Sequence, residues 1–354
     1  MKNCEKINEV FTYLQIEERY SYGVLYFSKG CATKLKLNHS LASKERKWLM
    51  DFYKKRTPSA EMLALRSLYL RMGLADSDRN QYFNLIKGYQ GEVLFDGMTK
   101  NLTCDCIILN DLLLSFGGNE FQIDTLMIYS ALIYLIDVKN FEGDHLYDKE
   151  KLYRLGSDYE LKNPLNQIQR CETQLHQMLQ SLGWKLPIHP SVIFINPDFT
   201  LYQTPIDRPF LYRSQLNRFL QKLNQTPSKL TAKHWQLAEK IASLHQTQSK
   251  NTKLPAYTYG QLKKGNFCEK CESFSVTVKD RTMVCGTCEH KEPVGAAIMR
   301  AVREFGLLFP GERLTTNIIM EWCGIIPSKK CIQNTLGKHL EKCGVGRGSY
   351  YVFK

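Results

Sequence analysis

The sequence predicts an α/β protein whose core is a mixed β-sheet flanked by helices, followed by two small C-terminal units. Within residues 104–196, three short runs rich in Ile, Leu and Val are followed by an amphipathic helical segment and a fourth apolar run. This order of strands and helix implies a mixed sheet with helices packed against it. At about 100–200 residues per domain, the chain of 354 residues is expected to form two or three folded units.

The composition is that of a globular protein with a basic surface. Hydrophobic residues make up 43% of the chain and charged residues 23%, which excludes wholesale disorder. Lys and Arg together number 48 against 35 Asp and Glu, a formal net charge of +13. A field of this sign attracts polyanions, so the expected partner is nucleic acid or an anionic membrane surface. A merely soluble basic protein is the alternative.

The sequence does not predict a secreted or membrane protein. Four glutamates interrupt the first 20 residues, which therefore do not resemble a signal peptide. No run of about 18 apolar residues occurs, so no transmembrane helix is expected. Of the two polyanionic partners, nucleic acid is the one we expect, and a membrane is not. We expect a cytoplasmic protein with reduced cysteines, and clustered cysteines in such a chain favour metal binding over disulfides.

The first part of the chain carries no clear chemistry. Residues 1–57 form a basic extension that we interpret as a solvated helical face, with nucleic-acid contact as the alternative. Thr57 and Pro58 then predict the start of a helix. The basic residues of the extension are Lys44, Arg46, Lys47, Lys54, Lys55 and Arg56.

The predicted sheet is interrupted by one helix. Asn163 and Pro164 predict an N-cap and a first helical residue, and the amphipathic pattern continues to about Ser181. The strands are expected within residues 104–114, 121–130, 131–139 and, after the helix, 191–196.

Two charged residues end the third predicted strand. Asp137 and Lys139 share one face, because side chains alternate along a strand, and their burial requires partners or a metal. If a hairpin is centred on Ser130 and Ala131, Asp124 lies opposite Asp137, with Cβ atoms about 4.5–5.5 Å apart. Two carboxylates at that distance repel unless a proton or cation lies between them, and Mg²⁺ suits an all-oxygen site. Lys139 could then hold an attacking water or steady charge on a phosphate; a structural Asp–Lys pair is the alternative.

Several short motifs, taken together, resemble the nuclease-related domain (NERD) family, a branch of the PD-(D/E)xK nuclease superfold. Their order and spacing match the family over roughly residues 58–225, which implies a restriction-endonuclease-like core. The C-terminal units also look like those appended in Bacillus-type members. The matching residues are Gly88-Tyr89-Gln90-Gly91-Glu92, Phe121-Gln122-Ile123-Asp124, Asp137-Val138-Lys139-Asn140 with Gly143, and Asn163-Pro164 followed by Gln167.

The resemblance implies a role for each of five residues. Asp124 and Asp137 would be the central ligands of a catalytic Mg²⁺ or Mn²⁺, with Glu92 as a further ligand, direct or through water. Lys139 would be the catalytic lysine and Gln167 the active-site glutamine. Asp137 stands where most members have Glu, so the metal position can shift and the activity can be lower.

Two Cys-x-x-Cys knuckles predict a zinc ribbon. Four thiolates at this spacing suit tetrahedral Zn²⁺, and a closed four-thiolate site leaves no open position, so the zinc is expected to be structural. A redox pair is the alternative. The ligands would be Cys268, Cys271, Cys285 and Cys288.

The C-terminal residues resemble a winged helix. Thr315 or Thr316 can cap a second helix and Ser328 a third, and a glycine-bounded hairpin follows. The third helix could enter a DNA groove; a helical packing module without ligand is the alternative. Its outward basic and amide side chains favour nucleic-acid binding. The predicted contacts are Lys329, Lys330, Gln333, Asn334 and Lys338 and, in the hairpin, Arg347.

The combined prediction is a metal-dependent nuclease that hydrolyses phosphodiester bonds, with DNA as the expected substrate. The alternative is a nucleic-acid-binding protein or a scaffold of a DNA-processing assembly, with a weak or inactive nuclease centre. The expected domains are a basic extension at 1–57, a nuclease-related domain at 58–225, a helical connector at 226–262, the zinc ribbon at 263–290 and the winged-helix-like unit at 291–354.

Overall fold

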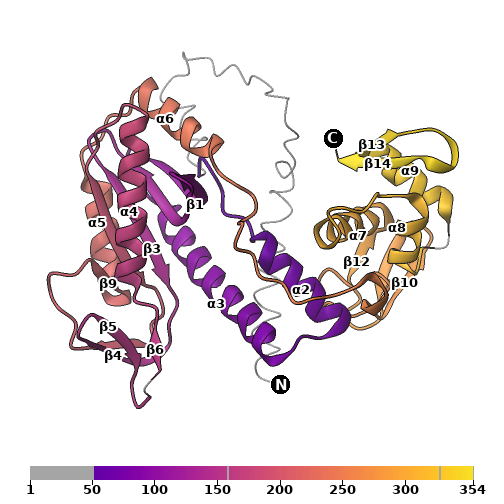
Figure 1. Ribbon diagram of the computed structural model, residues 1–354, viewed down its shortest axis with the longest axis horizontal. Coiled ribbons are helices and arrows are strands. Elements are labelled where there is room, and N and C mark those ends of the chain that lie inside the picture. The colour runs from indigo at the N-terminus through magenta and orange to yellow at the C-terminus, as the bar shows by residue number, and fades with distance from the viewer. Residues whose placement is uncertain (1–51, 158, 327, 354) are drawn as a thin grey trace. The chain divides into compact units, whose positions relative to one another are not determined.

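The computed structural model describes residues 52–353, except residues 158 and 327. These residues group into two compact units (Figure 1). The sheet unit contains residues 52–59 and 83–252, and the cysteine unit contains residues 60–82 and 253–353. None of the helices in this described part of the chain combines the length and apolarity needed to cross a bilayer.

A mixed sheet forms the centre of the sheet unit, as predicted; it has five strands, one more than the four expected from the sequence. The strands are ordered β1-β2-β3-β7-β9. The first three pair antiparallel, whereas β7 pairs parallel with both β3 and β9. Their bounds are β1 Ile107–Phe116, β2 Asn119–Ile128, β3 Ile133–Lys139, β7 Ile188–Phe194 and β9 Phe210–Tyr212.

Helices cover both faces of this sheet (Figure 1). On one face, α4 (Pro164–Ser181) and α6 (Ala232–Ser243) pack their apolar side chains against the strands. On the other face, the strands pack against the C-terminal half of α3 (Asp76–Thr99) and α5 (Leu216–Gln225). The predicted start of α4 is confirmed, since the Asn163 side chain accepts a hydrogen bond of 2.9 Å from the Leu165 amide.

The register of the β2–β3 hairpin is the one expected from a centre at Ser130 and Ala131. Thr125 faces Ile136, and Ile128 faces Ile133. The ladder ends at the Thr125–Ile136 pair, so Asp124 and Asp137 lie directly beyond its last rung. The hairpin therefore opens where the two carboxylates stand.

Side-chain alternation along β1 and β2 shifts beside this opening. Asp111 has a φ of 54°, in the left-handed region that Asp tolerates better than most residues. It stands between two paired residues of β1, opposite the position of Asp124 in the β1–β2 register. As a result, the core side chains that face α4 are three positions apart here instead of two. The two pairs are Leu109 and Leu112 on β1, and Ile123 and Leu126 on β2.

The segment at residues 52–56 corrects one expectation. It is extended: Tyr53 donates a backbone hydrogen bond to Ile108, and Lys54 forms a parallel bridge with Leu109. The Lys54 side chain is 16% exposed, and Arg56 is 5% exposed. The prediction of a solvated helical face is therefore wrong for Lys54 and Arg56, because the edge of β1 offers them partners. Lys44, Arg46 and Lys47 lie outside the described residues.

A second, four-stranded sheet was not predicted. It follows β3 and has the order β6-β5-β4-β8, in which β8 pairs parallel with β4. Its strands are short, and polar residues are interspersed with apolar ones along them. Their bounds are β4 Gly143–Asp148, β5 Lys151–Arg154, β6 Glu160–Leu161 and β8 Phe199–Tyr202.

The cysteine unit contains two small sheets and four helices in its described residues. One helix, α2 (Ala60–Met72), precedes the ribbon in the sequence and packs into the same core as α7. The side chains of Thr315 and Ser328 cap α8 and α9, as predicted. The remaining elements are β10 Val276–Lys279, β11 Thr282–Cys285, β12 Lys291–Pro293, α7 Val294–Leu308, α8 Thr316–Cys323, α9 Lys329–His339, β13 Leu340–Cys343 and β14 Tyr350–Phe353.

Candidate active site and metal centres

Two buried carboxylates meet where the β2–β3 hairpin opens. Asp124 on β2 and Asp137 on β3 are each 6% exposed. The Val138 amide donates a hydrogen bond of 2.8 Å to Oδ2 of Asp124. A side chain of β2 thus binds the backbone of β3 just beyond the last rung, which fixes Asp124 beside Asp137.

Asp137, Lys139 and Gln167 form a closed triangle of hydrogen bonds. Oδ1 of Asp137 accepts from Nζ of Lys139 at 2.9 Å and from Nε2 of Gln167 at 2.8 Å. Nζ of Lys139 also donates to Oε1 of Gln167 at 3.0 Å. Gln167 lies in the first turns of α4, whose start is set by the Asn163 cap. The predicted glutamine is therefore in direct contact with the predicted lysine.

The second oxygen of Asp137 is free to bind a cation. Its Oδ2 is buried and has no hydrogen-bond partner among the residues that the structure describes. Burial raises the pKa of Asp137 to about 6; the Lys139 ammonium opposes this rise, and the Asp124 carboxylate adds to it. A buried carboxylate oxygen without a donor is costly, and a hard divalent cation would supply the missing partner. The donor set at Asp124 and Asp137 therefore fits Mg²⁺ or Mn²⁺.

Lys139 keeps its charge at this site. Burial lowers its pKa, but the carboxylates of Asp137 and Asp124 outweigh that effect and raise the pKa above its ordinary value. A protonated ammonium has no free electron pair with which to act as a general base. It can donate hydrogen bonds and stabilise negative charge.

Glu92 does not join the two aspartates in a three-carboxylate cluster. Within the described ranges, the four cysteines form the one group of three or more potential metal-ligating side chains whose ligand atoms all lie within 4.8 Å of one another. Oε2 of Glu92 instead accepts a hydrogen bond of 2.5 Å from Nη1 of Arg56. Burial raises the pKa of Glu92 to about 8; Asp124 adds to this rise, and Arg56 opposes it. Glu92 thus interacts electrostatically with Asp124, but its carboxylate does not belong to the same cluster of potential ligand atoms.

Two charged residues beside the site were not predicted from the sequence. Arg56 contacts Glu92, and Asp111 lies next to Asp124 in the β1–β2 register. Burial raises the pKa of Asp111; Lys54 opposes this rise, and Asp124 contributes to it more weakly. Neither residue stands in a motif, so no local signal in the sequence marked them.

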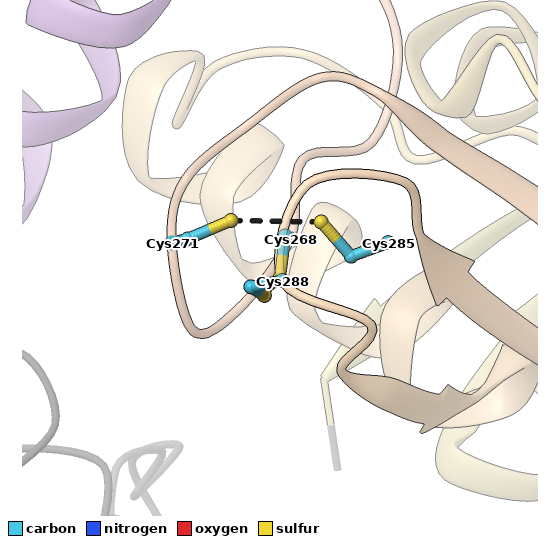
Figure 2. Close-up of side chains that lie close together, drawn as sticks. All are labelled: Cys268, Cys271, Cys285 and Cys288. Carbon is cyan, nitrogen blue, oxygen red and sulfur yellow. Dashed lines mark hydrogen bonds between the residues drawn. The ribbon is translucent and has the colours of Figure 1, made fainter.

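The four predicted cysteines come together in the cysteine unit (Figure 2). The Sγ atoms of Cys268 and Cys288 are 3.6 Å apart, and those of Cys271 and Cys285 are 3.5 Å apart. In each knuckle the first sulfur accepts a backbone amide hydrogen bond of 3.3 Å, from residues 270 and 287. Four sulfurs so close, stabilised by amide donors, are compatible with a tetrahedral zinc site. His290 lies outside this group and approaches Glu269 at 3.7 Å.

Helix α9 presents the predicted polar face to solvent. Its apolar side chains, Ile332 and Leu336, are fully buried. The side chain of Arg347 lies outside the described residues. The exposed residues of α9 include Lys329, Lys330, Gln333, Asn334 and Lys338.

One comparison with known proteins gave a match. Residues 87–195 match the family model described as the nuclease-related domain, NERD. The matched segment contains Glu92, Asp124, Asp137, Lys139 and Gln167, and it excludes Arg56, the four cysteines and α9. Neither the curated proteins nor the solved structures gave a match.

Proposed function

Because residues 87–195 match the family model of the nuclease-related domain, we propose that this chain is a metal-dependent nuclease that hydrolyses phosphodiester bonds, with DNA as the substrate. The observation that supports this most directly is the unpartnered, buried Oδ2 of Asp137 beside Asp124. A structural Asp–Lys pair accounts for Oδ1 of Asp137 but leaves its buried Oδ2 without a donor. A cation shared with Asp124 would supply the missing partner.

The residues of the site divide the chemical work. Asp124 and Asp137 would hold Mg²⁺ or Mn²⁺, which when bound lowers the pKa of a water molecule and stabilises charge on the phosphate. Lys139 carries a fixed positive charge next to Asp137, where it can orient a water or a phosphate oxygen. Gln167 holds the lysine in place by accepting from its ammonium and donating to Asp137. Glu92 acts from further away, through water or through its charge.

We propose a structural Zn²⁺ at Cys268, Cys271, Cys285 and Cys288. Four cysteine ligands leave no open coordination position, so this ion would stabilise the ribbon and take no part in hydrolysis. Thiolate ligands require reduced cysteines, which supports a cytoplasmic location.

We also propose that the end of the cysteine unit is a winged helix that binds DNA. Its elements follow the order helix, single bridge, helix, helix and hairpin: α7, the bridge from Leu314 to Tyr351, α8, α9 and β13–β14. The third helix carries exposed lysines and amides and no acidic residue. This face suits the phosphate backbone and base edges of DNA.

Incubation with circular DNA tests the proposed activity. Purified protein is mixed with circular single-stranded and double-stranded DNA in Mg²⁺, in Mn²⁺ and in EDTA. We expect cutting of circles that EDTA abolishes and that excess Mg²⁺ restores, with the zinc content measured in each sample. Cutting that persists in EDTA would contradict metal dependence.

A binding protein with a weak or inactive centre is the second candidate. Glu92 pairs with Arg56 rather than meeting the two aspartates, and Asp137 is shorter than the commoner Glu. Binding of circles without any cutting in Mg²⁺ or Mn²⁺ would favour this candidate.

A further inference from the structure

Arg56 connects α3 to the aspartate end of β2. Its guanidinium donates through Nε to Asp96 at 2.9 Å and through Nη1 to Glu92 at 2.5 Å. Through Nη2 it donates to the backbone carbonyl of Asp124 at 2.8 Å, to Oδ1 of Asp96 at 3.1 Å and to the Thr125 hydroxyl at 3.2 Å. The arginine is 5% exposed, so water does not screen these contacts.

The partners of Arg56 come from two elements, helix α3 and strand β2. Glu92 and Asp96 are four residues apart on α3, so they project from the same face of the helix. Thr125 forms the last rung of the β2–β3 ladder, and Asp124 lies directly beyond it. A planar guanidinium offers donors in several fixed directions and can therefore bind a helix face and a strand at once.

Charge makes this arrangement depend on the arginine. Arg56 interacts electrostatically with three acidic groups, Glu92, Asp96 and Asp124, and Glu92 also interacts with Asp124. Without a cation between them, the helix carboxylates would repel the Asp124 end of β2 or would take up protons. In either case the position of the Glu92 carboxylate relative to Asp124 would change.

We propose that Arg56 is a positioning residue of the candidate nuclease centre. It sets the position of Glu92 relative to Asp124 and holds the open end of β2 where Asp124 can share a cation with Asp137. Arg56 precedes residues 87–195, which match the family model. The matched segment alone would therefore lack one residue of the proposed centre. This inference rests on the proposed function for its consequence in catalysis, but its effect on cation binding is separate.

Binding of Mn²⁺ to the zinc-loaded full chain tests the inference, with the signal of free Mn²⁺ followed by electron paramagnetic resonance. The Asp137→Ala variant identifies the signal of this site. Arg56→Lys keeps the charge but loses the planar set of donors, and Lys55→Ala on the neighbouring exposed residue is the control. We expect Arg56→Lys to weaken Mn²⁺ binding at least tenfold and Lys55→Ala to leave it unchanged. Asp96→Asn, which removes one partner charge without unpairing a buried arginine, should weaken it by a smaller factor.

Chemical rescue separates positioning from stability. In folded Arg56→Ala, millimolar guanidinium should restore Mn²⁺ affinity and should have no such effect on Asp137→Ala. Loss of thermal stability alone, with wild-type Mn²⁺ affinity in folded Arg56→Lys and in Asp96→Asn, would overturn the proposal. If Arg56→Ala does not fold, these two variants decide the matter.

The result also separates this inference from the proposed function. A wild-type protein that binds Mn²⁺ through Asp137 but cuts no nucleic acid would refute the nuclease and leave the role of Arg56 intact, provided that Arg56→Lys weakens the binding. A wild-type protein without Mn²⁺ binding at Asp137 would overturn the inference as well.

Discussion

Burial and the neighbouring Lys139 shift the pKa of the Asp137 carboxyl group in opposite directions. Burial prevails and raises the pKa to about 6, against an ordinary value of 3.8. Between about pH 4 and pH 6, the folded protein therefore binds a proton that the unfolded chain has released. Its free energy of unfolding should fall as the pH rises through this interval.

The variant Asp137→Asn should lack this pH dependence. In buffer without added divalent cation, we expect it to be more stable than the wild type above pH 6 by about 3 kcal/mol, and the difference should disappear below about pH 4. Urea unfolding at several pH values measures this, with Asp144→Asn on an exposed carboxyl as the control. Equal pH dependence in wild type and Asp137→Asn would contradict the buried carboxyl described here.

The sequence predicted the position of some residues of the site and not of others. The approach of Asp124 to Asp137 follows from a hairpin register, which depends on few residues and was predictable. The contacts of Arg56 with Asp96 and Asp124 span 40 and 68 positions of the chain. No periodicity or motif encodes such a contact, so Arg56 was interpreted as part of a solvated face.

At the scale of the element, the zinc ribbon permits a direct test. We expect about one zinc per chain in the wild type and a loss of that zinc in Cys285→Ser, because three thiolates and a hydroxyl no longer form the tetrahedral thiolate site. Cys343→Ser, which lies outside the group, is the matched control. Elemental analysis with a thermal melt measures the effect, and an unchanged zinc content in Cys285→Ser would refute the assignment.

The proposed contact of helix α9 with nucleic acid can be tested through its exposed lysines. Replacing Lys329 and Lys330 by Ala should weaken nucleic-acid binding and reduce the slope of log affinity against log salt by about 2, because each lost phosphate contact releases about one fewer counterion. The same change at Lys233 and Lys240 on α6 serves as a matched pair of exposed helical lysines. If both pairs give the wild-type slope, α9 does not touch the phosphate backbone.

Elements with local signals were predictable, and elements without them were not. Asn163, Thr315 and Ser328 each cap the helix that the sequence assigned to them. The sheet of β4, β5, β6 and β8 was missed because its strands are two to six residues long. Its β4–β8 pairing also joins segments on either side of α4, which no local pattern indicates.

At the scale of the whole molecule, composition predicted several folded units and a polyanionic partner. The structure groups the described residues into two units, and residues 60–82 belong with the C-terminal one. This grouping depends on how α2 packs against α7, a contact between segments more than 200 positions apart. The net charge of +13 favours a polyanion but does not identify the substrate.

Above all, we propose that Asp137 holds the metal of a nuclease centre. The most direct test is the rate at which Asp137→Ala cleaves circular DNA at saturating Mg²⁺, measured beside a thermal melt. We expect cleavage to be abolished while folding and nucleic-acid binding persist, because the carboxylate binds the cation rather than holding the sheet. Asp137→Glu, with one more methylene, should retain or raise the activity. Cleavage by Asp137→Ala at the wild-type rate would contradict this account and would place the chemistry elsewhere in the chain.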